Sequence, residues 1–261
     1  MAKPVGQTTP RAAAESDEIS EEEIAEVHRI ADAKELGIAF QPIFELRSGE
    51  IYAYEALSRI RSKVFTNLER FYRAAAVSGR VGTLGRLHRE QAIRLAPRLP
   101  LFLNVNPNEF NFPWLVRADD PIFRREDVYL ELTESVPLSH FEQCRSVMEE
   151  VRKKGVHLAV DDLGAGYSNL KYISDLVPEI VKLDRDLITG IRNGTRQFRL
   201  LDSIVRLCKN LNAKVVAEGI ETPEELASVQ HANIDFCQGY LLGMPMQAKT
   251  DHLKIPDESL H

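Results

Sequence analysis

The sequence lacks the features that would place this protein in a membrane or outside the cell. No uninterrupted apolar run approaches the roughly 18 residues that a membrane span requires. The N-terminus has no basic stretch followed by an apolar one, so no secretory signal peptide is predicted. We therefore expect a cytoplasmic protein with no membrane partner.

Cysteine is scarce, and Cys144, Cys208 and Cys237 lie too far apart to form a redox pair or a zinc-binding motif. We expect these thiols to be reduced and buried. Positive charge is also in deficit, because 33 lysines and arginines stand against 39 acidic residues and leave a net charge of −6. Such a chain has no overall attraction for DNA or an anionic membrane, so a phosphate-bearing ligand must be held by local cations, of which bound metal is one kind.

The length and composition are sufficient for one large domain. The chain has 261 residues, of which 44% are hydrophobic and 28% charged, as in ordinary globular proteins. Residues 1–19 mix proline, glycine, threonine, alanine and acids without periodicity, which predicts a disordered tail or linker. We expect the main domain to occupy residues 37–248 and a short C-terminal tail to occupy residues 249–261.

A lead-in helix is predicted over residues 20–36, ahead of the main domain. Ser20 has the character of an N-cap with a glutamate three residues later, and apolar residues recur at helical spacing from Ile24 to Ile30. Gly37 is read as the stop signal of this helix.

Eight short, apolar runs rich in β-forming residues follow this helix. Between most of them lie amphipathic segments, such as 141–154 and 197–211, that are long enough for a helical crossover between parallel strands. The eight predicted strands read AFQPIFEL, IYAYEAL, LFLNVN, VYLELTE, VHLAVDD, EIVKLD, KVVAEGI and FCQGYLLG.

The first two strands are an exception, because only residues 47–50 join them. A crossover needs a dozen residues or more, so these two strands should pair antiparallel. The predicted fold is an α/β, TIM-like (β/α)8 barrel in which strand 1 is reversed relative to strand 2.

Polar residues that bind metal or phosphate recur where the predicted strands end. The carboxyl ends of barrel strands converge on one rim, so these residues should become neighbours. One such acid alone is as readily a helix cap or a surface ion pair; together they indicate a site. The set consists of Glu55, Asn104, Glu131, Asp161, Asp162, Lys182, Glu218 and Gln238.

So many carboxylates around one opening need cations to offset their repulsion and desolvation. Ligation by oxygen alone favours Mg²⁺ or Mn²⁺ over zinc, and no cysteine or histidine stands at these strand ends. The adjacent acids Asp161 and Asp162 are suited to two ions, the arrangement typical of in-line phosphodiester displacement.

The ordered motifs resemble the EAL-domain cyclic di-GMP phosphodiesterase family. The resemblance extends from about residue 37 to 248 and rests on several segments in the family's order. These are FQPI at 40–43, Glu55-Ala56-Leu57, LELTES at 130–135, DDLGAGYS at 161–168, KLD at 182–184, AEGIE at 217–221 and QGYLLGMPM at 238–246.

The resemblance implies metal-dependent hydrolysis of cyclic di-GMP to linear pGpG with two Mg²⁺ or Mn²⁺ ions. The implied ligands of the first ion are Glu55, Asn104, Glu131 and Asp161, and those of the second are Asp161, Asp162 and Glu218. Lys182, Glu218, Gln238 and the loop-anchoring Glu134 are the implied catalytic set. The implied substrate-binding residues are Gln41, Arg59, Asp184 and Pro245.

The family also suggests a homodimer through the region Asp162–Ser168 and a regulatory domain upstream. Leu163, Ala165 and Asn106 depart from the residues usual in the family and predict slower turnover. Two other functions stay open. One is a catalytically silent cyclic di-GMP receptor, which the filled ligand positions disfavour, and the other is a barrel enzyme acting on a different phosphodiester, such as a glycerophosphodiester.

Overall fold

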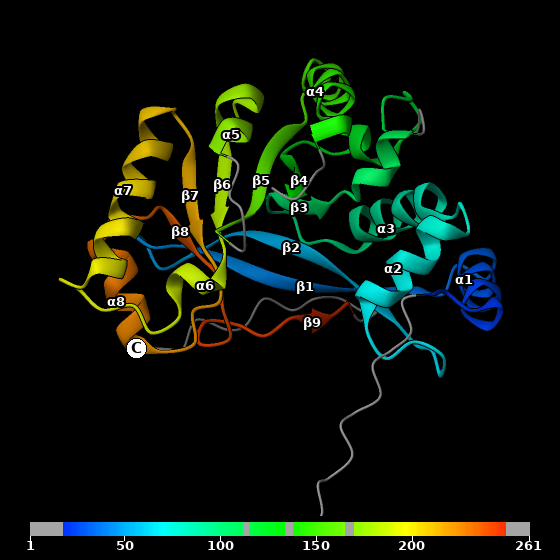
Figure 1. The fold of residues 1–261 in the computed structure, drawn as a ribbon, viewed down its shortest axis with the longest axis horizontal. Coiled ribbons are helices and arrows are strands. Elements are labelled where there is room, and N and C mark those ends of the chain that lie inside the picture. Colours follow the sequence, from blue (N-terminus) through cyan, green and yellow to red (C-terminus); the bar gives the residue numbers. More distant parts are fainter. Residues whose placement is uncertain (1–17, 112–114, 134–137, 165–169, 249–261) are drawn as a thin grey trace, which may run out of the picture.

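A closed β-sheet forms the centre of the molecule (Figure 1). The computed structural model describes residues 18–111, 115–133, 138–164 and 170–248. Strands β2 to β8 follow one another in chain order, and β1 closes the barrel by pairing with both β8 and β2. The strands are β1 (Leu36–Glu45), β2 (Ile51–Ile60), β3 (Leu101–Asn104), β4 (Val128–Thr133), β5 (His157–Leu163), β6 (Ile180–Leu183), β7 (Lys214–Ala217), β8 (Phe236–Cys237) and β9 (Met246–Gln247).

The reversed first strand is confirmed. Strands β2 to β8 are parallel to one another, whereas β1 is antiparallel to β2 and to β8. The turn between β1 and β2 is tight, and Gly49 adopts φ 74° there, a conformation that glycine adopts without steric cost. The TIM-like barrel with one antiparallel strand is therefore the fold of this chain.

Helices cover the outside of the barrel, with α3 and α4 on one side and α7 and α8 on the other (Figure 1). The two crossovers predicted over 141–154 and 197–211 are α4 and α7. The α-helices are α1 (Glu21–Asp32), α2 (Leu68–Val77), α3 (Val81–Leu95), α4 (Leu138–Arg152), α5 (Leu170–Leu176), α6 (Arg185–Ile188), α7 (Arg196–Asn210) and α8 (Pro223–His231), and two 3-10 helices are η1 (Pro107–Asn111) and η2 (Pro121–Arg124). None of the helices in the described part of the chain is long and apolar enough to cross a lipid bilayer.

Helix α1 begins as predicted and ends earlier than predicted. The side chain of Ser20 accepts a hydrogen bond from the backbone N–H of Glu23, and the carboxylate of Glu23 accepts one from the backbone N–H of Ser20, which completes a capping box. The helix ends at Asp32, and Gly37 lies inside β1. A Cβ at Gly37 would come within 3.3 Å of the Arg59 carbonyl oxygen, so the glycine serves strand pairing and is not the helix stop.

The eighth predicted strand is mostly a turn. Only Phe236–Cys237 is extended, and the chain then bends at Gly239, where a Cβ would lie 2.1 Å from the backbone oxygen of Ile220. Glycine is therefore needed for this close approach. The strand β9, which the sequence did not predict, adds to the edge of β1 through Ala39 and Phe40.

An apolar floor fills the barrel interior. Tyr129 stacks on Phe102 with ring centroids 4.5 Å apart, Tyr52 stacks on Phe236 at 4.2 Å, and the hydroxyls of Tyr52 and Tyr129 are 2.8 Å apart. Each of the eight barrel strands contributes to this floor, as expected for a packed barrel, and β2 adds Tyr52 to the one residue that each strand supplies. The contributors are Ile43, Ala53, Phe102, Tyr129, Ala159, Ile180, Val216 and Phe236.

Candidate functional site

The predicted polar residues meet in a ring directly above this floor. Side chains two positions apart along a strand point the same way, so Glu55 lies above Ala53. On the reversed strand β1 the order is inverted, and Gln41 precedes its floor residue Ile43 by two positions. The residues that stand two positions from the floor residues are Gln41, Glu55, Asn104, Glu131, Asp161, Lys182, Glu218 and Gln238.

Lys182 occupies the centre of the ring. Its side chain is only 1% exposed, and its ammonium group contacts three carboxylates on β2, β4 and β5 and a fourth on the residue directly after β7. The distances from Lys182 Nζ are 2.6 Å to Glu131 Oε1, 2.7 Å to Glu218 Oε1, 3.2 Å to Asp161 Oδ1 and 3.3 Å to Glu55 Oε2. One positive charge therefore faces four carboxyl groups in a setting with little water.

Burial and mutual repulsion raise the pKa of most of these acids. Burial raises the pKa of Glu218 to about 8 and that of Asp162 to about 6, and neighbouring carboxylates add to both shifts. The pKa of Glu131 is raised well above its ordinary value for the same reasons. Glu55 differs: burial alone would raise its pKa, but Lys182 and two side-chain amides lower it. The ring is therefore short of positive charge.

A bulge in β5 turns two consecutive acids toward the same cavity. In a regular strand Asp161 and Asp162 would point to opposite faces. The pairing with β6 slips by one residue between Val160 and Leu163, and Asp162 adopts φ 60°, a left-handed conformation that Asp tolerates better than most residues. Together with Glu218, the two acids offer oxygen atoms that all lie within 4.8 Å of one another.

The cavity above the ring has a volume of about 290 Å³. Arg185 and Tyr240, which sequence reasoning did not assign to the site, also line it, as does Glu221, for which the sequence left a site role and a structural role equally open. Arg185 pairs with Glu221 at 3.1 Å, and Tyr240 is 57% exposed at the mouth. Their places directly after β6, β7 and β8 were the available signal, because barrel sites are built from such loops.

The family model that matches residues 24–245 is described as the EAL domain. The chain belongs to the EAL domain family. Among named relatives, NbdA of Pseudomonas aeruginosa, named a cyclic di-GMP phosphodiesterase, is 31% identical over 227 residues. That match includes 81% of this chain but only 29% of NbdA, so this chain spans less than a third of that relative's length.

Solved structures agree with this assignment of the fold. The structure described as the PaMucR phosphodiesterase in complex with c-di-GMP is 27% identical, has a TM-score of 0.73, and matches 82% of this chain and 98% of its own. BlrP1 of Klebsiella pneumoniae, in a calcium and cyclic di-GMP complex, is 29% identical with a TM-score of 0.73, over 82% of this chain and 57% of its own.

In this EAL domain several predicted substrate-binding residues lie away from the cavity. Arg59 folds back, and its Nη1 donates to the carbonyl oxygen of Ser58 at 2.8 Å. Asp184 caps helix α6 by accepting from the backbone N–H of Asp186 at 2.7 Å. Arg59, Asp184 and Pro245 are not among the described residues that line the cavity. Gln41 does line the cavity, and its side-chain amide donates to the Gly243 carbonyl oxygen at 3.2 Å.

Other predictions fall outside the described residues. Glu134, the predicted loop anchor, lies there, as do Ala165 and the remainder of the predicted dimer region up to Ser168. The predicted tails over 1–19 and 249–261 lie outside as well, except for residues 18 and 19.

The donor set of the EAL site fits hard divalent cations. The ring offers carboxylate and amide oxygens without thiolate or imidazole, as Mg²⁺ and Mn²⁺ prefer. The buried Oε2 of Glu131 has no hydrogen-bond partner among the described residues, and such an orphaned acceptor needs a positive partner. Asn104 donates to Glu55 Oε1 at 2.9 Å, which leaves its own amide oxygen free to serve as a ligand.

The stability of the metal-free protein should fall as the pH rises. The folded pKa values of Asp162 and Glu218, about 6 and about 8, exceed their ordinary values of 3.8 and 4.5. Their contribution to folding is therefore complete at low pH and is lost as the pH rises through about 6 and then about 8. We expect the midpoint of thermal unfolding in EDTA to drop between about pH 5.5 and about pH 8.5. Excess Mn²⁺ should reverse this trend, because carboxyl groups bind a metal ion in their deprotonated form. A midpoint in EDTA that rises over this range would contradict the assigned shifts.

Proposed function

We propose that this EAL domain hydrolyses cyclic di-GMP to linear pGpG with the help of two divalent metal ions, in the cytoplasm. The supporting observation is the intact ring of oxygen donors around Lys182 at the barrel mouth, in which every ligand position of the family motif carries a suitable side chain. The names of the relatives point to the same substrate. A receptor without activity would have no need for such a costly set of buried acids.

Two groups of side chains would hold the ions. Asp161, Asp162 and Glu218 would hold one, and Glu55, Asn104, Glu131 and Asp161 would hold the other. When bound, two Mg²⁺ or Mn²⁺ ions supply charge that polarises the phosphodiester and eases deprotonation of a water.

The remaining ring residues would orient the reactants. Gln238 donates through Nε2 to Glu55 Oε2 at 2.8 Å, so its buried Oε1, which has no partner among the described residues, can accept a hydrogen bond from the attacking water. Lys182 would stabilise charge that develops on the phosphoryl oxygens. Arg59, which now donates to the backbone carbonyl of Ser58, would swing toward the substrate phosphate.

The decisive experiment is hydrolysis of cyclic di-GMP by the purified protein, with Mn²⁺ or Mg²⁺, analysed by chromatography of the products. We expect pGpG to appear with either ion and to be absent in EDTA. Tight binding without product would make the protein a receptor. If cyclic di-GMP is neither bound nor hydrolysed, another phosphodiester becomes the candidate substrate. The homodimer and the upstream regulatory domain stay predictions. Light scattering of the purified protein tests the homodimer, and the sequence of the full gene product tests the regulatory domain.

A further inference from the structure

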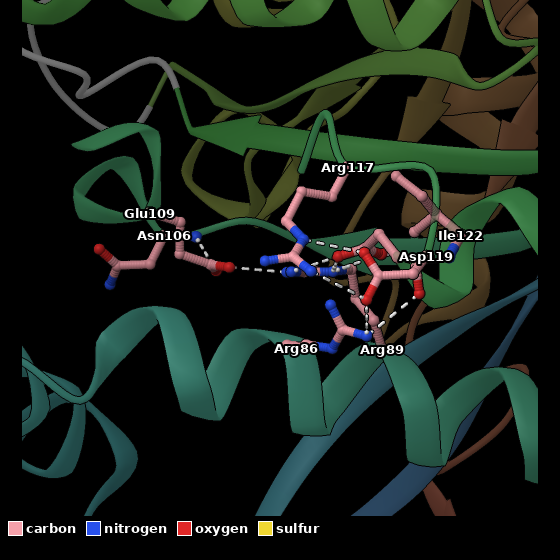
Figure 2. Close-up of polar contacts among 8 residues, drawn as sticks. Arg86, Arg89, Asn106, Glu109, Arg117, Asp119 and Ile122 are labelled. Carbon is pink, nitrogen blue, oxygen red and sulfur yellow. Dashed lines mark hydrogen bonds and ion pairs between the residues drawn. The ribbon is translucent and has the colours of Figure 1, made fainter. Parts of the chain in front are cut away.

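A buried arginine of helix α3 lies outside the ring and holds the segment between β3 and β4. Arg89 is fully buried, and its guanidinium group contacts two carboxylates that are themselves buried (Figure 2). Nη1 donates to Glu109 Oε2 at 2.6 Å, Nη2 donates to Asp120 Oδ2 at 3.0 Å, and Nε donates to Asp120 Oδ1 at 3.2 Å. Both acids belong to the segment between β3 and β4, so Arg89 fixes this segment at two points.

The second oxygen of Glu109 reaches the chain just after the predicted ligand Asn104. Glu109 Oε1 accepts from the backbone N–H of Asn106 at 3.2 Å, and the N–H of Glu109 donates to the Asn106 carbonyl oxygen at 2.8 Å (Figure 2). Asn104 is the last residue of β3, and it is exposed at the rim. Its side chain donates to Glu55 and its backbone pairs with β4, and the bond from Asn106 to Glu109 fixes the chain that leaves the strand.

Helix α3 leaves a space shaped for the Glu109 carboxylate. Gly85 lies one turn before Arg89, and a Cβ at this position would lie 2.0 Å from Glu109 Oε2 and 2.4 Å from Oε1. Glycine inside a helix costs about 1 kcal/mol relative to alanine, so its presence here calls for a compensating role. The missing side chain lets the carboxylate sit between Arg89 and Asn106.

Stability alone is a weak reason for this cluster. Two buried acids and one buried base carry a net negative charge, and apolar residues of similar volume often stabilise a protein as well or better. What the cluster provides is a fixed geometry, because a guanidinium fork holds two carboxylates in set directions.

We propose that Arg89, Glu109 and Gly85 form a positioning device that sets Asn104 for metal binding, an inference that rests on the proposed function. Glu109 is a positioning residue: it holds the Asn106 N–H and so fixes the chain that carries Asn104. Groups around a metal site that act through its ligands commonly change metal affinity by 10-fold to 100-fold.

Gly85→Ala tests the device without removing any charge. The new methyl group displaces the Glu109 carboxylate, and we expect Mn²⁺ to bind about tenfold more weakly in calorimetry, with kcat reduced by a similar factor and KM little changed. Glu109→Gln is the second variant; it keeps the shape but loses the charge-assisted bond to Arg89, and a similar weakening is expected. Folding of each variant is checked by circular dichroism in EDTA.

Asp119→Asn is the matched control. Asp119 adjoins Asp120 in the same loop, but its side chain is 51% exposed and pairs with Arg86 and Arg117 at the surface (Figure 2). The Asp119→Asn variant should bind Mn²⁺ with an affinity within about twofold of wild type, because a surface ion pair contributes little energy. Wild-type Mn²⁺ affinity in folded Gly85→Ala and Glu109→Gln would overturn the inference even if the wild-type protein hydrolyses cyclic di-GMP. An inactive wild-type protein whose variants still lose Mn²⁺ affinity would overturn the proposed function and leave the device in place.

Discussion

Asp161→Asn is expected to lower kcat for cyclic di-GMP hydrolysis by about 10³-fold or more. Asp161 would serve both ions, and loss of metal-derived stabilisation worth several kcal/mol corresponds to a factor of this size. The fold should survive, because the change removes one of the four carboxylates that share Lys182. Steady-state rates at saturating Mn²⁺ and thermal melts in EDTA measure the two effects separately.

Asp186→Asn makes the same chemical change at an exposed position in helix α6 on the same side of the barrel. Its rate should stay within about twofold of wild type, as for most surface substitutions. Full activity in Asp161→Asn would refute the two-metal assignment, whereas equal losses in both variants would point to a general effect of charge.

Lys182→Met should destabilise the metal-free protein more than any surface substitution. Removing one partner from a buried charge cluster typically costs about 3–5 kcal/mol, because the remaining charges lose their compensation. We expect a loss of this order in the free energy of unfolding at about pH 8 in EDTA. The loss should be smaller at about pH 6, where Glu218 and its neighbours take up protons instead.

Chemical denaturation at both pH values measures this effect, with Lys153→Met as control. Lys153 is 73% exposed in the turn that follows α4, and among the described residues its ion-pair partner is Glu150 at 3.9 Å, so its removal should change stability little. Mn²⁺ should stabilise Lys182→Met more than it stabilises the wild-type protein. Equal stability of wild type and Lys182→Met at about pH 8 would mean that the four carboxyl groups are already neutral.

The fold could be predicted from the sequence because its signals are local and periodic. Short apolar runs alternate with amphipathic segments, and the few residues between the first two strands leave no room for a crossover. The ring was predictable for the same reason, since a polar residue at the end of each strand must face the same rim.

The orientation of long side chains was not predictable. Arg59 could reach a phosphate by sequence position, yet its guanidinium bonds to the Ser58 carbonyl oxygen, a choice among many rotamers that depends on nearby atoms. Asp184 follows a strand as a ligand would, but it also precedes a helix, and capping that helix satisfies it.

The Arg89 cluster left no signal in the sequence. Its partners Glu109 and Asp120 stand 20 and 31 residues away, and an arginine in an amphipathic helix normally faces solvent. Gly85 lowers the helical propensity of its segment, but the sequence does not indicate that the Glu109 carboxylate occupies the place of its missing side chain. Such contacts depend on how the loop between β3 and β4 packs on α3, and that packing has no periodic pattern.

The reversal of β1 also decides how the chain is threaded. In a barrel built only of parallel strands the first strand starts at the face opposite the active site. Here Leu36, the first residue of β1, pairs with Ile60, the last residue of β2, so the chain enters at the face that carries the Lys182 ring. Helix α1 therefore packs beside that face, and residues 18 and 19 share a surface hollow with Asn106 and Asn108. A domain fused ahead of α1 would reach the active-site loops from the chain's point of entry, with no need to transmit its signal through the barrel.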